Sequence, residues 1–147
     1  MGIHDAIETT PNKEFAPEGW HVPSDAEWTT LEDQLIAYGY NYDGTITGNK
    51  IAQAMASIGW SASTVTGSPG NYQSANNDSG FNAFPEGIRF EDGSFFFEGN
   101  VASFWSSTEI NSNYAWGRDL SGNYSNLSRS SGNGYKWCGV SVRFVRD

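Results

Sequence analysis

The chain has 147 residues, of which 37% are hydrophobic and 17% are charged, and its formal net charge is −9. A chain of this length forms one domain whose core needs no covalent cross-link. The acidic balance argues against a general binder of nucleic acid or of anionic membranes. The single cysteine, Cys138, excludes an internal disulfide and a zinc cluster built from cysteines. We expect it to pack as a small apolar side chain.

Residues 1–16 are a polar segment interrupted by proline, and we place the folded domain at 17–147. The N-terminus lacks the basic and then apolar pattern of a signal peptide, and no apolar run is long enough to cross a bilayer. We therefore expect no membrane insertion. We also expect either synthesis without export or a leader and upstream parts that this sequence does not include.

A first helix is predicted to begin after Ser24. Ser24 and Glu27 form a capping box, in which each side chain accepts a hydrogen bond from the backbone amide of the other residue. Gly39 ends this helix. Apolar residues at helical spacing form its inner stripe, namely Trp28, Leu31, Leu35 and Tyr38.

A second helix is predicted from Asn49 to Ile58, with Gly59 as its stop. Its inner face consists of Ile51, Met55 and Ile58. Residues 60–80 follow and are rich in Ser, Thr, Gly and Asn. A segment of this length without a periodic pattern is either a packed functional loop or a disordered one, and the sequence leaves both open.

The second half of the chain shows the alternation typical of strands. Two short apolar runs, 87–90 and 94–97, flank Asp92-Gly93, a signal for a two-residue hairpin turn. Further strands are predicted at 102–109, 114–120, 123–130 and 139–147, with the third the weakest. On the strand at 114–120 we expect one face to carry Tyr114, Trp116, Arg118 and Leu120. Two helices followed by an antiparallel β meander predict an α+β domain.

The segment 111–136 has a composition of its own. Of its 26 residues, 19 are Asn, Ser, Tyr, Gly or Asp. Antibody binding loops use the same residues, because Tyr supplies contact area while Ser, Gly and Asn adapt around it. A polar, loop-rich sheet edge is the alternative interpretation. The position of the segment between two well-patterned strands favours a display surface on a scaffold.

Several blocks of the chain resemble a known family. They are GWHVPSDAEW at 19–28, NDSGFNAFPEG at 77–87, FWSSTE at 104–109, AW at 115–116 and GVSVRFVRD at 139–147. In this order they resemble the Fibrobacter succinogenes major paralogous domain, which belongs to the C-type-lectin-like fold group of bacterial surface and phage-associated proteins. The resemblance implies a C-type-lectin-like fold, and it implies binding rather than a known reaction.

The resemblance also implies a source of variation. Some members of this fold group are diversified by retroelements that rewrite adenines in a C-terminal variable region. AAC codons altered in this way yield Asn, Ser, Tyr, Asp, Gly and Arg, which fill the candidate variable region 111–136. The final block, 139–147, resembles the constant edge after such a region. Neutral drift in a polar loop is the alternative.

The chain departs from the family pattern at two places. In C-type-lectin-like folds the two termini pair as strands, whereas the segment before residue 17 is short and poorly patterned. The strand at 139–147 therefore lacks its usual neighbour unless residues 8–15 supply one. Phe144 stands where many members have a cysteine, which agrees with Cys138 having no partner.

No catalytic or metal-binding pattern stands out, and we predict no enzyme activity, no metal site and no cofactor. The formylglycine-generating members of the fold group need a pair of cysteines, which this chain lacks. His21, between two apolar residues, is expected to be structural. The oxygen-bearing residues at 41–43 and 76–78 could suit calcium, but turn hydrogen bonds are the favoured interpretation.

We therefore predict a non-catalytic display domain that recognises a surface protein or a glycan through a variable C-terminal face. Aromatic anchors and adaptable polar side chains form the candidate ligand-binding set, namely Asn111, Asn113, Tyr114, Trp116, Arg118, Asn123, Tyr124, Asn126, Arg129, Asn133 and Tyr135. Trp105 and Trp137 are expected in the core. The alternative is a structural assembly or adhesin module without a diversified site.

The predicted setting is a bacterial cell surface, the extracellular space or a phage virion, with no nucleic-acid partner. We expect the chain to belong to a larger surface or virion assembly, or to self-associate through its N-terminal segment, because an under-paired strand edge invites a partner.

Overall fold

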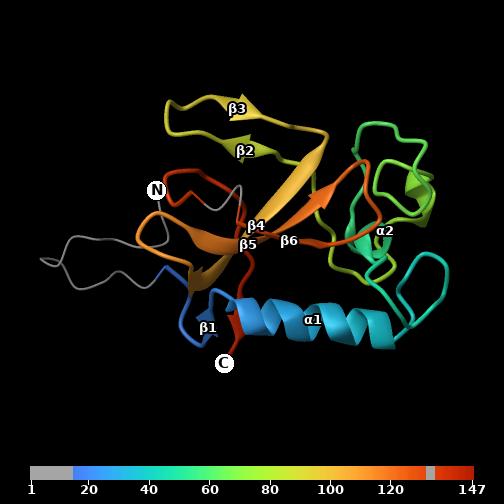
Figure 1. Ribbon diagram of the computed structural model, residues 1–147, viewed down its shortest axis with the longest axis horizontal. Helices are drawn as coiled ribbons and strands as arrows, with labels where there is room; N and C mark the ends of the chain where they lie inside the picture. Colours follow the sequence, from blue (N-terminus) through green and yellow to red (C-terminus); the bar gives the residue numbers. More distant parts are fainter. Residues whose placement is uncertain (1–14, 132–134) are drawn as a thin grey trace, which may run out of the picture.

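The computed structural model of the chain describes residues 15–131 and 135–147, and it has the predicted α+β architecture (Figure 1). The helices are α1 (Asp25–Ala37), α2 (Ala52–Met55) and the 3₁₀ turn η1 (Gln73–Ala75). The strands are β1 (Trp20–His21), β2 (Ile88–Arg89), β3 (Phe95–Phe96), β4 (Val101–Glu109), β5 (Ala115–Ser121), β6 (Ser128–Ser130) and β7 (Val145–Arg146). The strands pair antiparallel in three small sheets, β1–β7, β2–β3 and β4–β5–β6.

Helix α1 begins at the predicted capping box. The backbone amide of Glu27 donates to Ser24 Oγ at 3.3 Å, and the amide of Ser24 donates to Glu27 Oε2 at 2.8 Å. The helix buries Trp28 and Leu35. Tyr38, predicted on the same apolar stripe, is instead exposed, because it caps the helix where the chain turns away.

Helix α2 is much shorter than the predicted span of 49–58, because backbone amides on both sides of it bond to other parts of the chain. The amide of Lys50 donates to Asn41 Oδ1 at 2.8 Å, and the amide of Ser57 donates to the Ala83 carbonyl at 2.8 Å. Ile51 and Met55 are fully buried, as predicted. Ile58, predicted on the inner face, is 69% exposed, so this part of the prediction was wrong.

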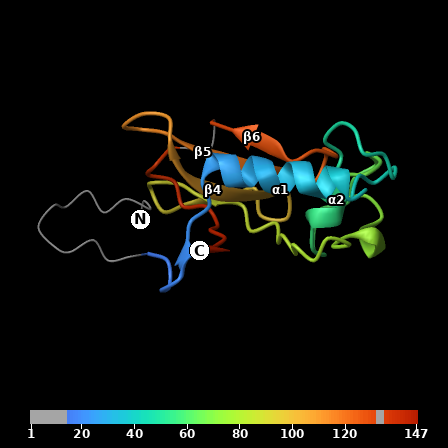
Figure 2. The ribbon, with the colours of Figure 1, turned by 90° about the horizontal axis from the view of Figure 1, so that it is seen from below.

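The largest sheet, β4–β5–β6, forms one wall of the core. Helix α1 runs across it, and α2 lies at the C-terminal end of the helix (Figure 2). Between the pairs Trp105↔Gly117 and Glu109↔Ala115, strand β4 has two more residues than β5 and bulges. Trp105 is buried, as predicted. The core cluster includes Trp28, Phe104, Leu120 and Leu127.

Strand pairing near the two ends of the described chain corrects the prediction for 139–147. Only Val145–Arg146 is a strand, and its neighbour is Trp20–His21. The proposed alternative neighbour, 8–15, lies outside the described residues except for Phe15, whose ring packs against Phe144 with 5.7 Å between centroids. Before β7, the chain makes single bridges, from Gly139 to Arg89 and from Ser141 to Phe104.

The hairpin β2–β3 forms where it was predicted, but its loop has three residues rather than two. The amide of Phe90 donates to the Ser94 carbonyl at 2.8 Å, which closes the loop Glu91–Asp92–Gly93. The amide of Gly93 donates to the Phe90 carbonyl at 3.0 Å, and Gly93 has φ +88°. A turn followed by a left-handed residue is the usual three-residue solution, and it places glycine at the last loop position.

The sequence left open whether the polar segment 60–80 is a packed loop or a disordered one. In the structure it is a packed loop. Ser61 donates from its amide to the Gly99 carbonyl at 2.7 Å, and Gly70 donates to the Gly122 carbonyl at 3.2 Å. The Gln73 side chain donates to the Trp60 carbonyl at 2.7 Å. Because backbone groups of this loop bond to distant segments, it folds against α2 and the β5–β6 connection.

Candidate binding surface

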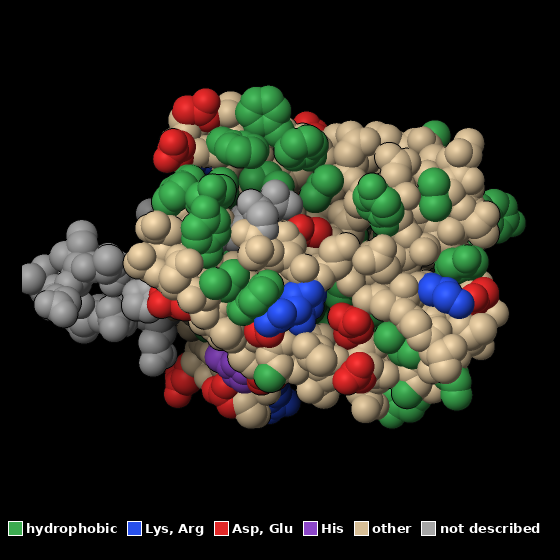
Figure 3. Space-filling view, in the orientation of Figure 1, with side chains coloured by type: hydrophobic (Ala, Val, Ile, Leu, Met, Phe, Trp, Pro, Cys, Tyr) green, Lys and Arg blue, Asp and Glu red, His purple; other side chains and the backbone are tan. Residues whose placement is uncertain are grey.

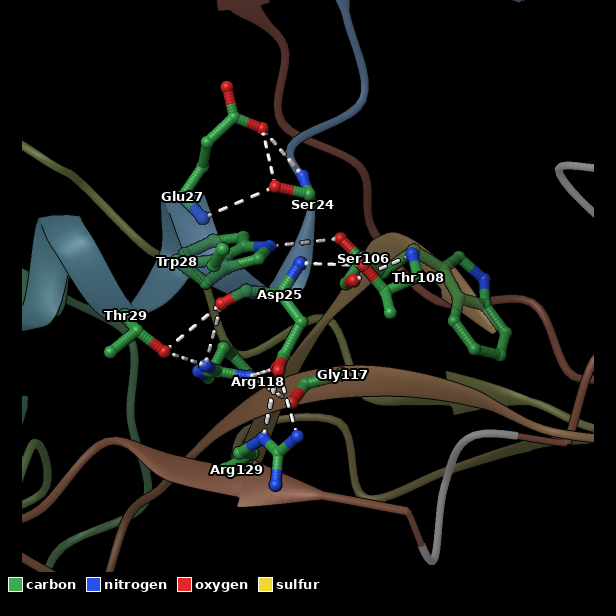
Figure 4. Close-up of polar contacts among 12 residues, drawn as sticks. Ser24, Asp25, Glu27, Trp28, Thr29, Ser106, Thr108, Gly117, Arg118 and Arg129 are labelled. Atoms are coloured by element: carbon green, nitrogen blue, oxygen red, sulfur yellow. Dashed lines mark hydrogen bonds and ion pairs between the residues drawn. The ribbon is translucent and has the colours of Figure 1, made fainter. Parts of the chain in front are cut away.

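The N-terminus of α1 is fixed to the central sheet by two arginines. Arg118 of β5 and Arg129 of β6 both bind the carboxylate of Asp25, with nitrogen–oxygen distances of 2.6 Å and 2.8 Å (Figure 4). The Arg118 side chain is 1% exposed. Hydrogen bonds from Arg129 and then Arg118 hold the pKa of Asp25 below its ordinary value, although partial burial opposes this.

The bulge of β4 fastens the same helix end from the other side. The amide of Asp25 donates to Thr108 Oγ1 at 3.0 Å, and the indole of Trp28 donates to the Trp105 carbonyl at 3.2 Å (Figure 4). The amide of Ser107 donates to the Pro23 carbonyl at 2.9 Å. We call this set of contacts around Asp25 the helix–sheet junction. It fixes the strand that leads into the polar segment 111–136.

Beyond the junction, three aromatic rings stack on one another at the protein surface. The centroids of Tyr114 and Tyr135 are 4.4 Å apart, and those of Tyr135 and Trp137 are 4.5 Å apart with an angle of 26° between the planes. We call these three residues the aromatic stack. Trp137 is 43% exposed, so the prediction that it lies in the core was wrong. Its ring is covered by Tyr135 rather than by the core.

Backbone and side-chain contacts hold the two segments of the stack together. Tyr114 and Tyr135 form an antiparallel bridge, and the amide of Lys136 donates to the Asn113 carbonyl at 3.0 Å. The ammonium of Lys136 binds the carboxylate of Glu109 at 2.5 Å. A hydrogen bond with the Tyr135 hydroxyl raises the pKa of Tyr114 above its ordinary value. The Tyr114 phenol is therefore neutral at physiological pH and able to donate a hydrogen bond.

Four of the predicted ligand-binding residues gather around this stack. Tyr114 and Tyr135 belong to it, and Asn111 and Asn113 are exposed in the turn that precedes Tyr114. Asn111 also shapes that turn, since its side-chain oxygen accepts from the amides of Asn113 and Tyr114 at 2.9 Å and 3.1 Å. Asn113 therefore has the freer side chain of the two.

Three other predicted residues lie at the opposite end of β5. Asn123, Tyr124 and Asn126 follow Ser121 in the β5–β6 connection, close to α2 (Figure 1). Seven strand residues span about 20 Å, which separates this group from the aromatic stack. Tyr124 is 63% exposed, whereas the Asn126 amide donates to Ser128 Oγ at 3.0 Å. The predicted set is therefore split between two surfaces.

The remaining predictions have different outcomes. Arg118 is buried in the helix–sheet junction, so its assignment to the ligand-binding face was wrong: β5 is covered by α1 where this side chain emerges. Arg129 is half exposed, but its guanidinium lies 3.4 Å above the ring of Trp116 and binds Asp25. Arg129 and Trp116 therefore lie at the border between the helix–sheet junction and the exposed surface. Asn133 lies outside the described residues.

Sequence reasoning missed two parts of this surface. The first is Trp137, which was expected in the core but is 43% exposed. The phenylalanines of the β2–β3 hairpin, Phe95 and Phe96, were treated only as strand residues although both are exposed. The signal was present as three consecutive phenylalanines, 95–97, next to a polar turn, since a strand can bury only alternate side chains against one core.

The candidate calcium-binding residues make turn contacts. Asn41 is buried, and its amide donates to the carbonyls of Thr45 and Gly48 at 2.8 Å and 3.0 Å. The Asn76 amide donates to the Ser57 carbonyl at 2.6 Å. Over residues 15–131 and 135–147, no group of three or more His, Cys, Asp or Glu side chains is arranged to hold a metal ion.

The described histidine and cysteine also have structural surroundings. His21 contacts Asp147 at 2.6 Å and Glu27 at 2.8 Å, and these hydrogen bonds raise its pKa. The ring thereby joins β1 to the N-terminus of α1 and to the last residue. Cys138 is buried, as predicted, and burial raises the pKa of its thiol. None of the helices in the described chain has the length and apolar character needed to span a bilayer.

Taken together, short antiparallel sheets, one capped helix and an exposed aromatic stack define an α+β domain with a candidate recognition surface. The family model of the Fibrobacter succinogenes major domain matches residues 5–146. The chain therefore belongs to that family. No curated protein and no solved structure matches the chain.

Proposed function

We propose that the chain is a non-catalytic display domain that binds a protein or a glycan on a cell surface through the aromatic stack and the turn before it. The observation that carries the proposal is the stack itself. Tyr and Trp are the residues most enriched at binding hot spots, and Trp137 keeps almost half of its surface open. The neighbouring asparagines, Asn111 and Asn113, supply adaptable polar contacts.

The surroundings of the stack support recognition rather than chemistry. The Tyr114 phenol is neutral, and the ion pair of Lys136 with Glu109 beside the stack is partly exposed. The helix–sheet junction holds β5 in place, and a surface on rigid elements loses little conformational entropy when it binds. These features suit a preorganised contact patch.

We further propose a C-type-lectin-like fold and a place on a bacterial surface or a phage virion. The pairing of β1 with β7, which joins the two ends of the described domain, is the feature of that fold group that the chain shares. In this proposal the segment 111–136 is the variable region, and its scaffold is the junction around Asp25.

The coding DNA tests the variable-region part. Diversification predicts AAC-like codons clustered at the exposed positions Asn111, Asn113 and Asn123, together with a near-repeat of this stretch that differs mainly at adenines. Ordinary codon usage without a near-repeat would favour the rival, a structural assembly or adhesin module.

A binding comparison tests the recognition part. The fluorescently labelled chain is applied to bacterial cells, to their isolated surface proteins and to a glycan array. The variant Tyr135→Ser/Trp137→Ser should lose at least about tenfold in affinity, as expected when hot-spot residues are removed. The control Tyr38→Ser removes a tyrosine at the end of α1 that is 75% exposed and lies outside the aromatic stack. Equal binding by all three proteins, at unchanged melting temperature, would contradict the proposal.

A further inference from the structure

The β2–β3 hairpin exposes an apolar surface that the proposed ligand site does not use. Phe95, Phe96 and Phe97 are 69%, 51% and 52% exposed. The ring of Phe96 packs edge-on against Phe90 at 5.3 Å and lies 6.3 Å from Phe97. We call Phe90, Phe96 and Phe97 the phenylalanine face. Phe95 alternates with Phe96 along β3 and is exposed on the other side of the hairpin. Hydrophobic side chains gather over this hairpin in Figure 3 and continue down the left side of the view.

The backbone keeps Phe97 in an unfavourable conformation. Phe97 has φ +65°, in the left-handed region that bulky side chains rarely adopt. Its carbonyl accepts from the amides of Asn100 and Val101 at 2.9 Å and 3.0 Å, which fixes the residue there. Without this turn, Phe97 would point to the face of the strand opposite to Phe96. Instead the two rings are neighbours, and both are open to solvent.

The hairpin is held firmly against the rest of the domain. Arg89 and Gly139 exchange two backbone hydrogen bonds, at 2.9 Å and 2.7 Å, and the amide of Gly87 donates to the Val101 carbonyl at 2.9 Å. Any side chain at position 87 would collide with the Phe96 carbonyl, since a Cβ there would lie 2.2 Å away. The phenylalanine face is therefore presented on a fixed support.

Acidic side chains surround this apolar surface. Four exposed carboxylates, at Glu86, Glu91, Asp92 and Glu98, lie in the hairpin and at its base. The one basic residue in 86–98 is Arg89, so this stretch carries a net charge of +1 − 4 = −3. Acidic side chains are visible beside the hydrophobic ones at the top of Figure 3. An apolar centre with a charged rim is the layout of a protein interface.

We propose that the phenylalanine face docks a second protein through a segment whose apolar side chains are flanked by lysine or arginine. Charge complementarity selects this occupant, because a basic rim meets an acidic one and steers the encounter. A second copy of the chain would bring two acidic rims together at a net charge of −9 each. An anionic membrane would be repelled for the same reason.

A displayed library of random 12-residue peptides, about the length that covers such a face, tests the proposal. Peptides that bind the variant Phe96→Ser/Phe97→Ser are removed first, and the remaining peptides are selected on the intact chain. The proposal expects enrichment of aromatic or leucine residues flanked by Lys or Arg. Synthetic copies should bind the double variant at least about tenfold more weakly than the unaltered chain.

Two further variants separate charge from folding. Glu91→Gln/Asp92→Asn/Glu98→Gln leaves the phenylalanines in place and should weaken binding and reduce its salt dependence. Ile58→Ser, which alters an exposed apolar residue beside α2, should bind as the unaltered chain does. Melting curves are recorded for all variants to check that each one folds.

The proposal is overturned by acidic or uncharged consensus peptides, by binding that the hairpin variants leave unchanged, or by a selection without enrichment. It is equally overturned if the chain forms a dimer that Phe96→Ser dissociates, or if it binds vesicles containing phosphatidylserine through this face. None of these results bears on the aromatic stack, so the two proposals fail separately.

Discussion

The middle of strand β5 and the residue just before the strand differ sharply in their surroundings, although they are close in sequence. Arg118 is buried and bonded to Asp25, whereas Tyr114, four residues earlier, stacks with Tyr135 at the surface. The difference comes from what covers the strand. Helix α1 lies over the part around Arg118 and leaves the end near Tyr114 uncovered. A residue's place along the strand, rather than its type, thus decides between scaffold and surface.

This contrast implies two kinds of response to mutation. In the helix–sheet junction, charged groups have been taken out of water and depend on one another, so removal of one leaves its partner unpaired. In the aromatic stack, the rings contact each other and solvent, so removal of one costs mainly a stacking contact. We expect the stability of the domain to depend on the junction and its recognition to depend on the stack.

The largest effect is expected from Asp25→Ala. The variant removes the carboxylate that binds the buried guanidinium of Arg118, and loss of one partner of a buried pair costs about 3–5 kcal/mol of unfolding free energy. Urea denaturation measures this. Asp33→Ala, on an exposed position of the same helix, is the control and should change stability by less than about 0.5 kcal/mol. Similar losses of stability for both variants would show that the helix–sheet junction is no more important for stability than an exposed position of α1.

A smaller effect is expected from acid. The pKa values of Asp25 and Glu27 lie below their ordinary values of 3.8 and 4.5, Asp25 because of the arginines and Glu27 because of the Ser24 amide. Their contribution to stability is therefore present above pH 4.5 and is lost as the pH falls through 4.5 and 3.8 toward the lower folded-state values. Denaturation midpoints from about pH 6 to pH 2 should show this loss, and Asp25→Ala should flatten it. If the midpoint of the Asp25→Ala variant falls with pH as steeply as that of the unaltered chain, other groups cause the acid sensitivity.

The capping box gives an effect of about 0.5–2 kcal/mol. Ser24→Ala removes the hydroxyl that accepts from the Glu27 amide and leaves that amide unpaired. The free energy of unfolding reports it. Thr30→Ala is a suitable control, because its hydroxyl bonds only within the helix, to the Ala26 carbonyl. If Ser24→Ala is as neutral as the control, the cap does not stabilise the helix.

The smallest effect is expected on the exposed polar positions. Joint replacement of Asn113 and Asn123 by other polar residues should cost no more than about 0.5 kcal/mol for each position. Differential scanning fluorimetry would detect the shift in melting temperature. Collapse of the domain would mean that the segment 111–136 holds the fold rather than displaying side chains.

Local patterns in the sequence were enough to predict the capped helix, the hairpin and the α+β class, because each depends on residues near one another in the chain. The length of α2 could not be predicted, since it is limited by bonds to Asn41 and Ala83. Only part of the candidate site could be predicted from the sequence, because the rest depends on contacts between residues that are distant in the chain. Composition pointed to 111–136, but only the fold shows that Tyr114 and Tyr124 lie at opposite ends of β5 and that Arg118 is covered.

The central claim is that the junction holds the fold and the aromatic stack does not. Two libraries of the displayed chain test it directly, one randomised at Asp25, Thr108 and Arg118 and the other at Tyr114, Tyr135 and Trp137. Both are selected only for resistance to protease. The account predicts that the junction library returns to the original residues while the stack library keeps diverse, mainly polar ones. A stack library that returns to its aromatic residues, with a tolerant junction, would contradict it.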